Sequence, residues 1–214
     1  MRHETVETGK FITFEGGEGA GKSTQATLLA ERLKAAGRTV VVTREPGGSP
    51  KAEQIREALL SGKVREFGPL AEAVLFSVAR QDHIDNVIGD ALAKGRWVIS
   101  DRFHDSTRAY QGSGGGVPPA VLSALERLTL NGLRPHLTIV LDIPVEQGLA
   151  RASRRQTGPD RFESQDVAQH EKIRQAFLDI AQEDPRRCII IDASKPEALV
   201  AEDIWEAVAE RLRP

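Results

Sequence analysis

Cysteine is nearly absent from this sequence, which has 214 residues and a single cysteine, Cys188. One cysteine excludes an intrachain disulfide and any zinc site built from several cysteines. Cys188 lies inside an apolar run. We therefore predict that it is a small buried apolar side chain in a protein of a reducing compartment.

Long apolar runs and an excess of one charge are also missing. No run approaches the roughly 18 apolar residues needed to span a bilayer. Residues 1–10 are polar, lack the apolar core of a signal peptide, and are expected to form a short N-terminal extension. Lysine and arginine number 29 against 31 acidic residues, a net charge of −2. We expect a cytoplasmic protein whose main partner is neither nucleic acid nor a membrane.

Five short apolar runs alternate with longer helical patterns. The runs occupy residues 11–14, 39–43, 97–100, 137–142 and 188–192. None of them alternates apolar with polar residues, so each is predicted to be a strand of a parallel sheet, buried on both faces. This alternation predicts a three-layer α/β fold, with a five-stranded parallel sheet flanked by helices.

Three of the helices have recognisable limits. One is predicted from a glycine-rich loop to about Ala36, one from about Pro69 to Lys94, and one over residues 195–213, with Pro196 at its start. The last helix has an apolar face. Its members are Leu199, Val200, Ile204, Val208 and Leu212.

Two segments, residues 44–50 and 110–119, are too rich in glycine and proline to be regular. Each follows a predicted strand, and open α/β sheets bind ligands beside the loops that follow their strands. No repeat or linker interrupts the sequence, so residues 1–214 are predicted to form one domain. The polar, basic segment at about 150–165 is expected to be a mobile flap within it.

A phosphate-binding loop follows the first run. Gly16 and Gly21 enclose four residues and are followed by Lys22 and Ser23, as in the pattern G-x-x-x-x-G-K-[ST]. Glycines let backbone N–H groups surround phosphate oxygens, Lys22 reaches the outer phosphates, and the Ser23 hydroxyl binds Mg²⁺. The nucleotide-binding residues predicted here are Gly16, Gly17, Glu18, Gly19, Ala20, Gly21, Lys22, Ser23 and Thr24.

The loop alone does not define the class of enzyme. The N-K-x-D motif of GTPases is missing. The third run ends in Asp101 and Arg102, where a hydrolytic ATPase usually has two acidic residues. Arginine grips phosphate with two parallel hydrogen bonds, so Arg102 is the strongest candidate for holding a second, phosphorylated substrate. Arg44, Arg56 and Arg80 are further candidates.

Aromatic residues make up only 5% of the chain, so few rings could contact a nucleobase. Phe76 and Arg80 are four residues apart and share one face of their predicted helix. Packing of Phe76 in the core is an equal alternative. Tyr110 is the only tyrosine, and a structural or a ligand-binding role is equally open for it.

Five segments resemble, in order and spacing, those of bacterial thymidylate kinases, which are P-loop nucleoside monophosphate kinases. They are FEGGEGAGKST, TREPGGSPKAEQIR, VLFSVARQDH, SDRFHDSTRAYQG and RASRRQTGPDRFE, between residues 11 and 163. The resemblance implies a P-loop NTP hydrolase fold with a basic lid, and ATP- and Mg²⁺-dependent phosphorylation of dTMP to dTDP. It also implies a homodimer, formed through the helix from Pro69 to Lys94.

The resemblance assigns roles to residues near the phosphates. Arg56 and Arg102 correspond to arginines that hold the dTMP phosphate, and Glu18 to an acidic residue that faces the acceptor sugar and phosphate. Asp101 corresponds to a carboxylate near the metal and the reacting phosphates. Lys22, Asp101 and Arg102 are therefore expected to be catalytic.

Further roles concern the base and the sugar of dTMP. Phe76 corresponds to the ring that stacks on thymine, Arg80 to the side chain that donates to its O4, and Thr107 to the residue that reads N3. Tyr110 corresponds to a ring packed near the sugar 2′ carbon. A ring in contact there leaves no room for the extra hydroxyl of a ribonucleotide.

The basic flap is explained by the same resemblance. The phosphate loop carries no positive charge except Lys22, and in the bacterial branch of the family a basic lid closes over ATP and excludes water. Candidates for the compensating charge are Arg151, Arg154, Arg155 and Arg161. We expect Arg151 and Arg161 to be the catalytic pair.

Two other functions stay open. One is a nucleoside monophosphate kinase for dCMP, GMP or AMP, which a panel of acceptors would separate from a dTMP kinase. The other is a nucleotide-gated switch that hydrolyses ATP slowly. A switch needs neither the arginines of the acceptor side nor an acceptor, so its ATP consumption would not depend on added dTMP.

Overall fold

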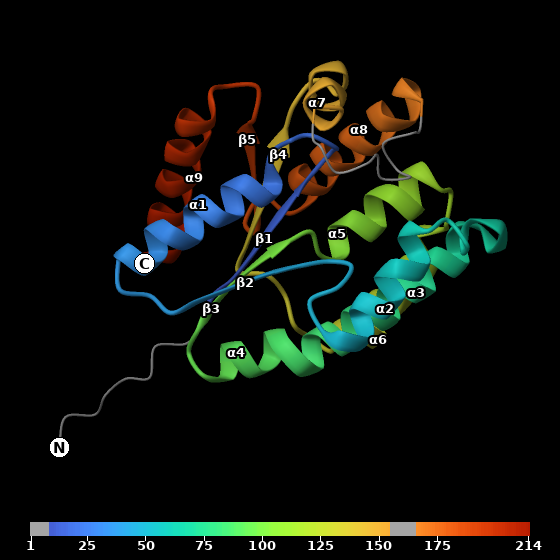
Figure 1. The fold of residues 1–214 in the computed structure, drawn as a ribbon, viewed down its shortest axis with the longest axis horizontal. Helices are drawn as coiled ribbons and strands as arrows, with labels where there is room; N and C mark the ends of the chain where they lie inside the picture. Colours follow the sequence, from blue (N-terminus) through green and yellow to red (C-terminus); the bar gives the residue numbers. More distant parts are fainter. Residues whose placement is uncertain (1–8, 155–165) are drawn as a thin grey trace.

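The computed structural model describes residues 9–154 and 166–214. They contain a sheet made of the strands β1 (Phe11–Gly16), β2 (Val40–Arg44), β3 (Trp97–Asp101), β4 (Leu137–Asp142) and β5 (Cys188–Asp192). The strand order is β2-β3-β1-β4-β5, and every pairing is parallel (Figure 1). The predicted five-stranded parallel sheet is therefore confirmed.

Helices connect these strands. Their bounds are α1 (Lys22–Ala35), α2 (Pro50–Leu60), α3 (Gly68–His83), α4 (Gly89–Ala93), α5 (His104–Thr107), α6 (Pro119–Leu130), α7 (Val145–Ala152), α8 (Val167–Glu183) and α9 (Glu197–Leu212). A 3₁₀ turn precedes α3, and π-helical segments continue α3 and α5. These are η1 (Arg65–Phe67), η2 (Ile84–Ile88) and η3 (Arg108–Gly114).

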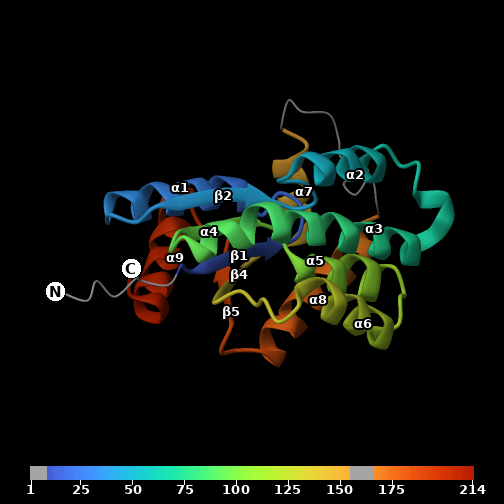
Figure 2. The same cartoon turned by 90° about the horizontal axis from the view of Figure 1, so that it is seen from below.

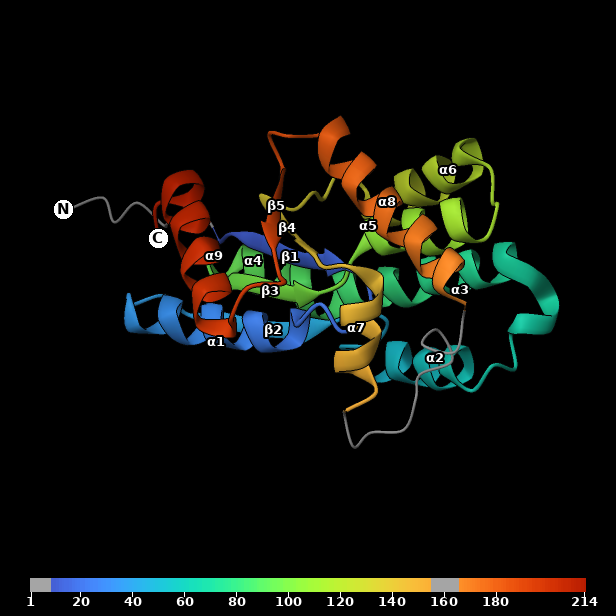
Figure 3. The same ribbon diagram turned by 90° about the horizontal axis from the view of Figure 1, so that it is seen from above.

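The sheet is the middle layer of three. Successive residues of a strand point to opposite faces. On one face Ile12 and Ile99 pack in a cluster with α1 and α9. On the other face Phe11 and Val98 pack with η2 and α4, and Val140 packs with α8. Figures 1 and 3 show α1 and α9 on one side of the sheet and α8 on the other.

Burial differs between the centre and the edges of the sheet. β1 is buried along its whole length, and β3 and β4 are buried up to their last residues. In the edge strands β2 and β5, Val42 and Ile190 are 45% and 41% exposed. The prediction that all five runs are buried on both faces is wrong for these two strands, because helices cover the edges of this sheet less completely than its centre.

The three predicted helices are confirmed, with one difference. α1 ends at Ala35, and α3, η2 and α4 together cover residues 68–93. α9 begins after Pro196, as predicted, and buries Val200 on its apolar face. Leu199 was expected on that face but is 54% exposed. Leu199 lies at the border of the apolar face of α9, where a small rotation of the helix decides whether a side chain contacts the core.

The two segments rich in glycine and proline behave differently. β2 ends at Arg44 and α2 begins at Pro50, so the segment between them is irregular as predicted. The prediction of an irregular segment is wrong for residues 110–114, because η3 continues to Gly114. Here Gln169 Nε2 of α8 donates to Gly114 O at 2.7 Å. Such tertiary contacts outweigh the low helix propensity of glycine.

Two expectations from composition can be compared with the structure. Cys188 is 3% exposed, which confirms that its side chain is buried, and burial raises the pKa of its thiol to about 12. In the described parts of the chain, no helix has the length and apolar character required to cross a membrane.

The carboxyl ends of the parallel strands all lie at the same end of the sheet. Both Phe14 of β1 and Arg44 of β2 are in register with Asp101 of β3. The segments that follow these three strands therefore begin side by side. α2, α3 and α6 lie beyond this end of the sheet, with α3 packed against the other two (Figures 1 and 2). The candidate site lies between these helices and the carboxyl ends of the strands.

Candidate active site

The loop between β1 and α1 has the backbone of a phosphate-binding loop. Gly16, Gly19 and Gly21 have φ angles of 134°, 68° and 89°, a region that glycine adopts without strain. A Cβ on Gly19 would lie 1.8 Å from the carbonyl oxygen of Gly148 in α7. The N-terminal N–H groups of α1, which have no partner within the helix, are available to an anion in this loop.

Lys22 lies across the loop. Its Nζ donates to the carbonyl oxygens of Gly16 and Gly17 at 3.1 and 2.7 Å. Burial, together with the nearby Arg102 guanidinium, lowers the pKa of Lys22 to about 8. A triphosphate beside this ammonium group would raise its pKa again, because a neighbouring anion favours the charged form.

Ser23 and Asp101 come together from the start of α1 and the end of β3. Ser23 Oγ donates to Asp101 Oδ2. Oxygen donors of this kind suit Mg²⁺, which takes one or two protein ligands and completes its shell with phosphates and water. Residues 9–154 and 166–214 contain no group of three or more His, Cys, Asp or Glu that could hold a metal. Two protein oxygens that leave room for phosphate ligands fit Mg²⁺ shared with a nucleotide.

Arg102 occupies an unusual backbone conformation directly after β3. Its φ is 69°, the left-handed region that costs a non-glycine residue of order 1–3 kcal/mol. Arg102 N donates to Phe14 O at 2.8 Å, and Ser100 Oγ donates to Arg102 O at 2.7 Å. The next amide, Phe103 N, donates to Glu15 Oε1 at 2.8 Å. These bonds hold the turn that directs the Arg102 side chain toward the phosphate loop.

The Arg102 guanidinium is surrounded by acceptors. Nη2 donates to Glu18 Oε1 at 2.7 Å and to Tyr110 OH at 3.0 Å. Nη1 donates to Gly16 O and Ser106 Oγ, both at 3.2 Å. Tyr110 donates its own hydroxyl to Glu18 Oε1 at 2.6 Å. Burial disfavours the charge of Arg102, but Tyr110 and the nearby carboxylates outweigh it, so the pKa of Arg102 lies above its usual value.

Two further arginines face the cavity from the β2 side. Arg56 of α2 is half-buried and donates from Nη1 to Pro46 O at 2.7 Å. Arg44 is exposed, and its Nη2 lies 3.2 and 3.3 Å from the carboxylate oxygens of Glu53. Arg56 is thus the better placed of the two to contact a ligand inside the cavity, and Arg44 lies at its rim.

The predicted base-binding residues form a further part of the cavity wall, on α3 and α5. Arg80 of α3 donates from Nη2 to Thr107 Oγ1 at 3.0 Å and to Phe103 O at 3.2 Å. Phe76 lies one turn earlier on α3, is half-buried, and lines the same cavity. A ring that borders a cavity differs from a ring enclosed in the core, so the position of Phe76 favours the ligand-binding alternative.

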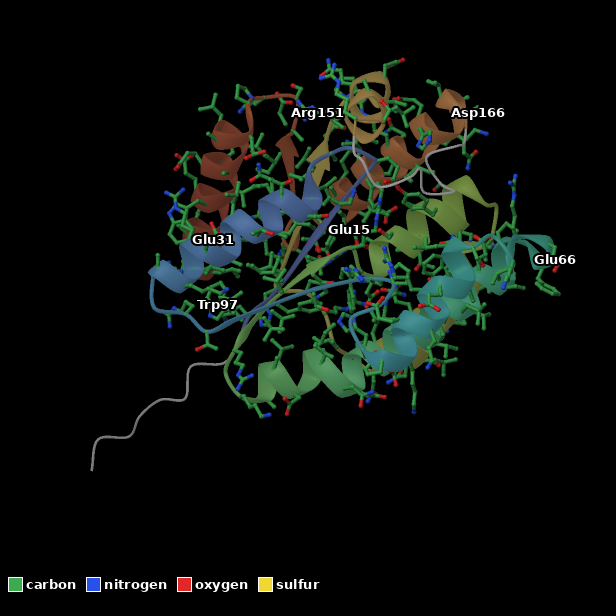
Figure 4. All side chains as sticks on the ribbon, in the orientation of Figure 1. Glu15, Glu31, Glu66, Trp97, Arg151 and Asp166 are labelled. Carbon is green, nitrogen blue, oxygen red and sulfur yellow. The ribbon has the colours of Figure 1, made fainter. Side chains whose placement is uncertain are left out.

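Arg151 lies on α7, at the end of the sheet opposite to Trp97 (Figure 4). Its Nη1 donates to Ala193 O at 2.8 Å and its Nη2 to Ser194 O at 3.3 Å. It borders the same cavity as the phosphate loop. In this arrangement the side chain is directed toward the segment that precedes α9. It makes no hydrogen bond to the cluster of Arg102, Glu18 and Tyr110, which we call the Arg102 cluster.

The other lid candidates can be placed only in part. Arg154 follows α7 and is exposed. Arg155 and Arg161 lie outside the described residues.

One continuous cavity of about 1050 Å³ is bordered by most of the predicted site residues. They are Glu18, Lys22, Ser23, Arg56, Phe76, Arg80, Asp101, Arg102, Thr107, Tyr110 and Arg151. Residues 18–25 of the phosphate loop and α1 form one side, and side chains of α2, α3, α5 and η3 form the other. Pockets that hold one small ligand measure roughly 300–1,000 Å³, so this cavity lies at the upper limit of that range. Gly16 and Gly17 instead border a smaller cavity behind the loop, toward α8.

Sequence reasoning missed two buried carboxylates that support the site. Glu15 accepts hydrogen bonds from Phe103 N at 2.8 Å and Ser106 Oγ at 2.6 Å, and burial raises its pKa. Glu45 accepts from Arg80 Nε at 2.7 Å. The available signal was an acidic residue within an apolar strand or directly after one, since a charge at such a position is rarely buried without a partner.

The geometry defines a class of protein. Lys22 and the loop that carries it border the same cavity as Arg56 and Arg102, so one cavity can hold a nucleoside triphosphate end to end with a second phosphorylated ligand. On a parallel sheet of this topology, the arrangement is that of a P-loop kinase.

Comparison with known proteins defines the family. The thymidylate kinase family model matches residues 14–204. Thymidylate kinases of Nitrobacter hamburgensis and of a Bradyrhizobium species are each 57% identical over 206 residues, which cover 95% of this chain and 90% and 91% of theirs. The crystal structure of thymidylate kinase from Ehrlichia chaffeensis matches with a TM-score of 0.76 and 32% identity, over 94% of this chain and 99% of that one. The chain belongs to the thymidylate kinase family.

Proposed function

We propose that this protein transfers the γ-phosphoryl group of ATP to dTMP, giving dTDP and ADP. The observation that carries the proposal is the meeting of two anion sites and a base wall in one cavity. The phosphate loop faces Arg56 and Arg102, and Phe76, Arg80 and Thr107 lie beyond them. The names of the relatives support the same reaction.

The acceptor phosphate binds between Arg56 and Arg102 in this proposal. One of its oxygens attacks the γ-phosphorus of ATP and forms a new P–O bond. The bond between the γ-phosphorus and the bridging oxygen breaks, and ADP leaves. The acceptor phosphate is largely ionised at neutral pH, so it needs no strong general base. The protein aligns the two phosphates and neutralises their charge.

The donor side holds the triphosphate. The loop backbone and Lys22 bind its phosphates, and Ser23 and Asp101 hold Mg²⁺. The bound ion supplies positive charge at the outer phosphates. Glu18 faces the acceptor sugar and phosphate, because it reaches out of the phosphate loop to Arg102 and Tyr110.

The base wall selects thymine. Phe76 stacks on the base, Arg80 donates to O4, and Thr107 Oγ1 accepts from N3–H. Tyr110 borders the sugar, and its ring occupies the space that a ribose 2′-hydroxyl needs. Burial raises the pKa of Tyr110 well above its ordinary value, so its hydroxyl stays a neutral hydrogen-bond donor to Glu18.

We also propose that residues 1–214 act as one kinase domain in the cytoplasm, where the lone buried thiol of Cys188 is expected to stay reduced. The lid expected at residues 150–165 belongs to this proposal, with Arg151 and Arg161 acting on the transferred phosphoryl group; residues 155–165 of it lie outside the described residues. Arg151 must release Ala193 O and Ser194 O to do so, because both bonds hold it away from the Arg102 cluster.

A coupled assay of ADP formation tests the proposed function. ATP and Mg²⁺ are supplied with dTMP, dUMP, dCMP, GMP or AMP in turn. We expect ADP formation to depend on the acceptor and to be fastest with dTMP, and dTMP and dUMP to exceed the purines. Preference for GMP or AMP would indicate another monophosphate kinase. ADP formation at the same rate without any acceptor would indicate a switch.

We further propose that the protein is a homodimer formed through α3. Leu70, Val74 and Val78 follow one another at four-residue spacing on α3 and are 51%, 40% and 50% exposed. Leu128 of the adjacent α6 is 77% exposed. Such a patch is typical of a protein interface, and one patch that meets its own copy gives a two-fold dimer.

Light scattering during size-exclusion chromatography tests this interface. Val74→Arg places a charge in the centre of the patch and is expected to give a monomer. Leu199→Arg, at an apolar residue of α9 that is 54% exposed, is the matched control and should leave the dimer intact. A monomeric parent protein, or a dimeric Val74→Arg variant, would contradict the proposed interface.

A further inference from the structure

A chain of buried polar side chains lies behind the base wall and runs from β2 to α3. Glu45 Oε2 accepts from Arg80 Nε at 2.7 Å, and Glu45 Oε1 lies 3.1 Å from His83 Nδ1. The side chains of Glu45 and Arg80 are each 4% exposed, and that of His83 is 0% exposed. His83 Nε2 in turn lies 2.7 Å from Thr43 Oγ1.

A carboxylate can only accept hydrogen bonds, so His83 Nδ1 is the donor in its bond to Glu45 Oε1. His83 Nε2 and the Thr43 hydroxyl form the next hydrogen bond of the chain. The backbone of Gly48 closes over this pair, since a Cβ there would lie 2.4 Å from His83 Nε2 and 2.5 Å from Thr43 Oγ1. Glu45 and His83 are thus buried and bonded to each other, and Gly48 lies against the His83–Thr43 pair.

The cluster also fixes the orientation of Arg80. Its Nε is bound by Glu45, and its Nη2 donates to Phe103 O and Thr107 Oγ1. The guanidinium carbon lies 5.4 Å from the centre of the Phe103 ring. Within the described part of the chain Nη1 makes no hydrogen bond, while Arg80 borders the large cavity. Nη1 of Arg80 is therefore available to donate to a ligand.

The segment that carries Glu45 reaches the phosphate end of the acceptor site as well. Pro46, the next residue, accepts a hydrogen bond on its carbonyl oxygen from Arg56 Nη1 at 2.7 Å. Arg80 is assigned to the base of the acceptor and Arg56 to its phosphate. Two consecutive residues after β2 thus position the side chains at both ends of the same ligand.

We propose that Glu45, supported by His83 and Thr43, is a specificity-determining positioning residue that selects pyrimidine monophosphates with a carbonyl at position 4. This inference rests on the proposed function, in which Arg80 contacts the base. Arginine is always protonated and can only donate. When Arg80 is held in place, its Nη1 donates to the carbonyl of thymine or uracil. The amino group of cytosine is itself a donor and cannot accept from Nη1. The exclusion of dCMP then depends on Arg80 being unable to turn away.

Glu45→Gln tests the inference, because it keeps the shape of the side chain and removes the charge. Kinetics are measured with dTMP, dUMP and dCMP. We expect the ratio of kcat/KM for dTMP over dCMP to fall by about tenfold or more, mainly through a higher KM for dTMP, since polar sites discriminate strongly only while their buried groups are fixed. The dTMP to dUMP ratio and the KM for ATP should stay unchanged. An unchanged dTMP to dCMP ratio in a folded variant would overturn the inference.

A milder pair of variants decides the question if Glu45→Gln does not fold. Thr43→Val removes the outermost bond of the cluster. Thr13→Val is its matched control, because Thr13 Oγ1 bonds Thr138 Oγ1 at 2.8 Å inside the sheet, away from the base wall. We expect a fall of about threefold in the dTMP to dCMP ratio for Thr43→Val, the size of one modest hydrogen bond, and none for Thr13→Val. Equal ratios in both variants would overturn the inference.

Kinetics of the parent protein distinguish a failure of the proposed function from a failure of the role of Glu45. If it forms no ADP with dTMP, the proposed function fails and the inference with it. If it uses dTMP well but Glu45→Gln discriminates as the parent does, the proposed function stands and only the role of Glu45 is lost.

Discussion

The two sides of the cavity are built by different means. The donor side relies on main-chain geometry, with glycines at positive φ and Lys22 bonded to the carbonyls of Gly16 and Gly17. The acceptor side relies on charged side chains that hold one another, as Glu18 holds Arg102. The donor side should therefore be most sensitive to atoms added to the backbone, and the acceptor side to charges that are removed.

The largest effect is expected on the acceptor side. Arg102→Ala removes the guanidinium that neutralises the transferring group, and turnover with dTMP should fall by roughly 10³-fold. Steady-state kinetics with saturating ATP measure this, and circular dichroism confirms that the variant is folded. Arg102→Lys, a point charge without the planar fork, should recover only part of the loss. Near-normal kinetics of Arg102→Ala with dTMP would contradict the assignment.

On the donor side a single methyl group should be damaging. Gly19→Ala places a Cβ 1.8 Å from Gly148 O at φ 68°. Gly62→Ala is the matched control, because Gly62 has φ 78° and no atom within 4 Å of a Cβ. Both variants share the cost of a positive φ, so the contact with Gly148 O should make Gly19→Ala lose about 1–3 kcal/mol more unfolding free energy than the control, and bind ATP more weakly. Urea unfolding and ATP titration measure both, and equal losses would show that the contact with α7 is unimportant.

The donor side should also respond to pH. Lys22 has a pKa of about 8 without ligand, and bound phosphates raise it. Below pH 8 the ammonium is already charged and ATP affinity should be flat. Above pH 8 binding requires proton uptake, so affinity should fall by up to about tenfold per pH unit. ATP titrations from pH 7 to 10 measure this. Lys22→Arg should remove the slope, and a parent protein without the slope would contradict the role of Lys22.

The smallest effect separates the hydroxyl of Tyr110 from its ring. Tyr110→Phe removes the hydrogen bond to Glu18 Oε1 and the one from Arg102 Nη2, and kcat/KM for dTMP should fall by about five- to tenfold. Preference for dTMP over its ribonucleotide analogue should persist, because the ring is kept, whereas Tyr110→Ala should lose it. Kinetics with both nucleotides measure this. Loss of the preference in Tyr110→Phe would show that the hydroxyl, and not the ring, excludes ribose.

Much of the fold could be predicted because it depends on local patterns. The continuous apolar runs at residues 97–100 and 137–142 predict buried parallel strands, and they form β3 and β4 at the centre of the sheet. The run at residues 39–43 is rich in valine and does not alternate apolar with polar residues either, but it forms the edge strand β2. Composition could not separate them, since the exposure of a strand depends on how many helices cover it.

The candidate site could be predicted where its residues fall in recognisable segments, as Arg102 and Phe76 do. Their supports could not be predicted, because each acts through a partner remote in sequence. Glu15 binds the amide of Phe103 across 88 positions, and Glu45 binds Arg80 across 35. Only the register of the sheet and the packing of α3 bring these partners together.

A crystal structure of the protein with dTMP tests the central claim most directly. The account predicts that the phosphate lies within hydrogen-bond distance of Arg56 and Arg102, that thymine stacks on Phe76, and that its O4 meets Arg80 Nη1. A nucleotide bound away from these residues, or one whose phosphate lies in the loop beside Lys22, would contradict it.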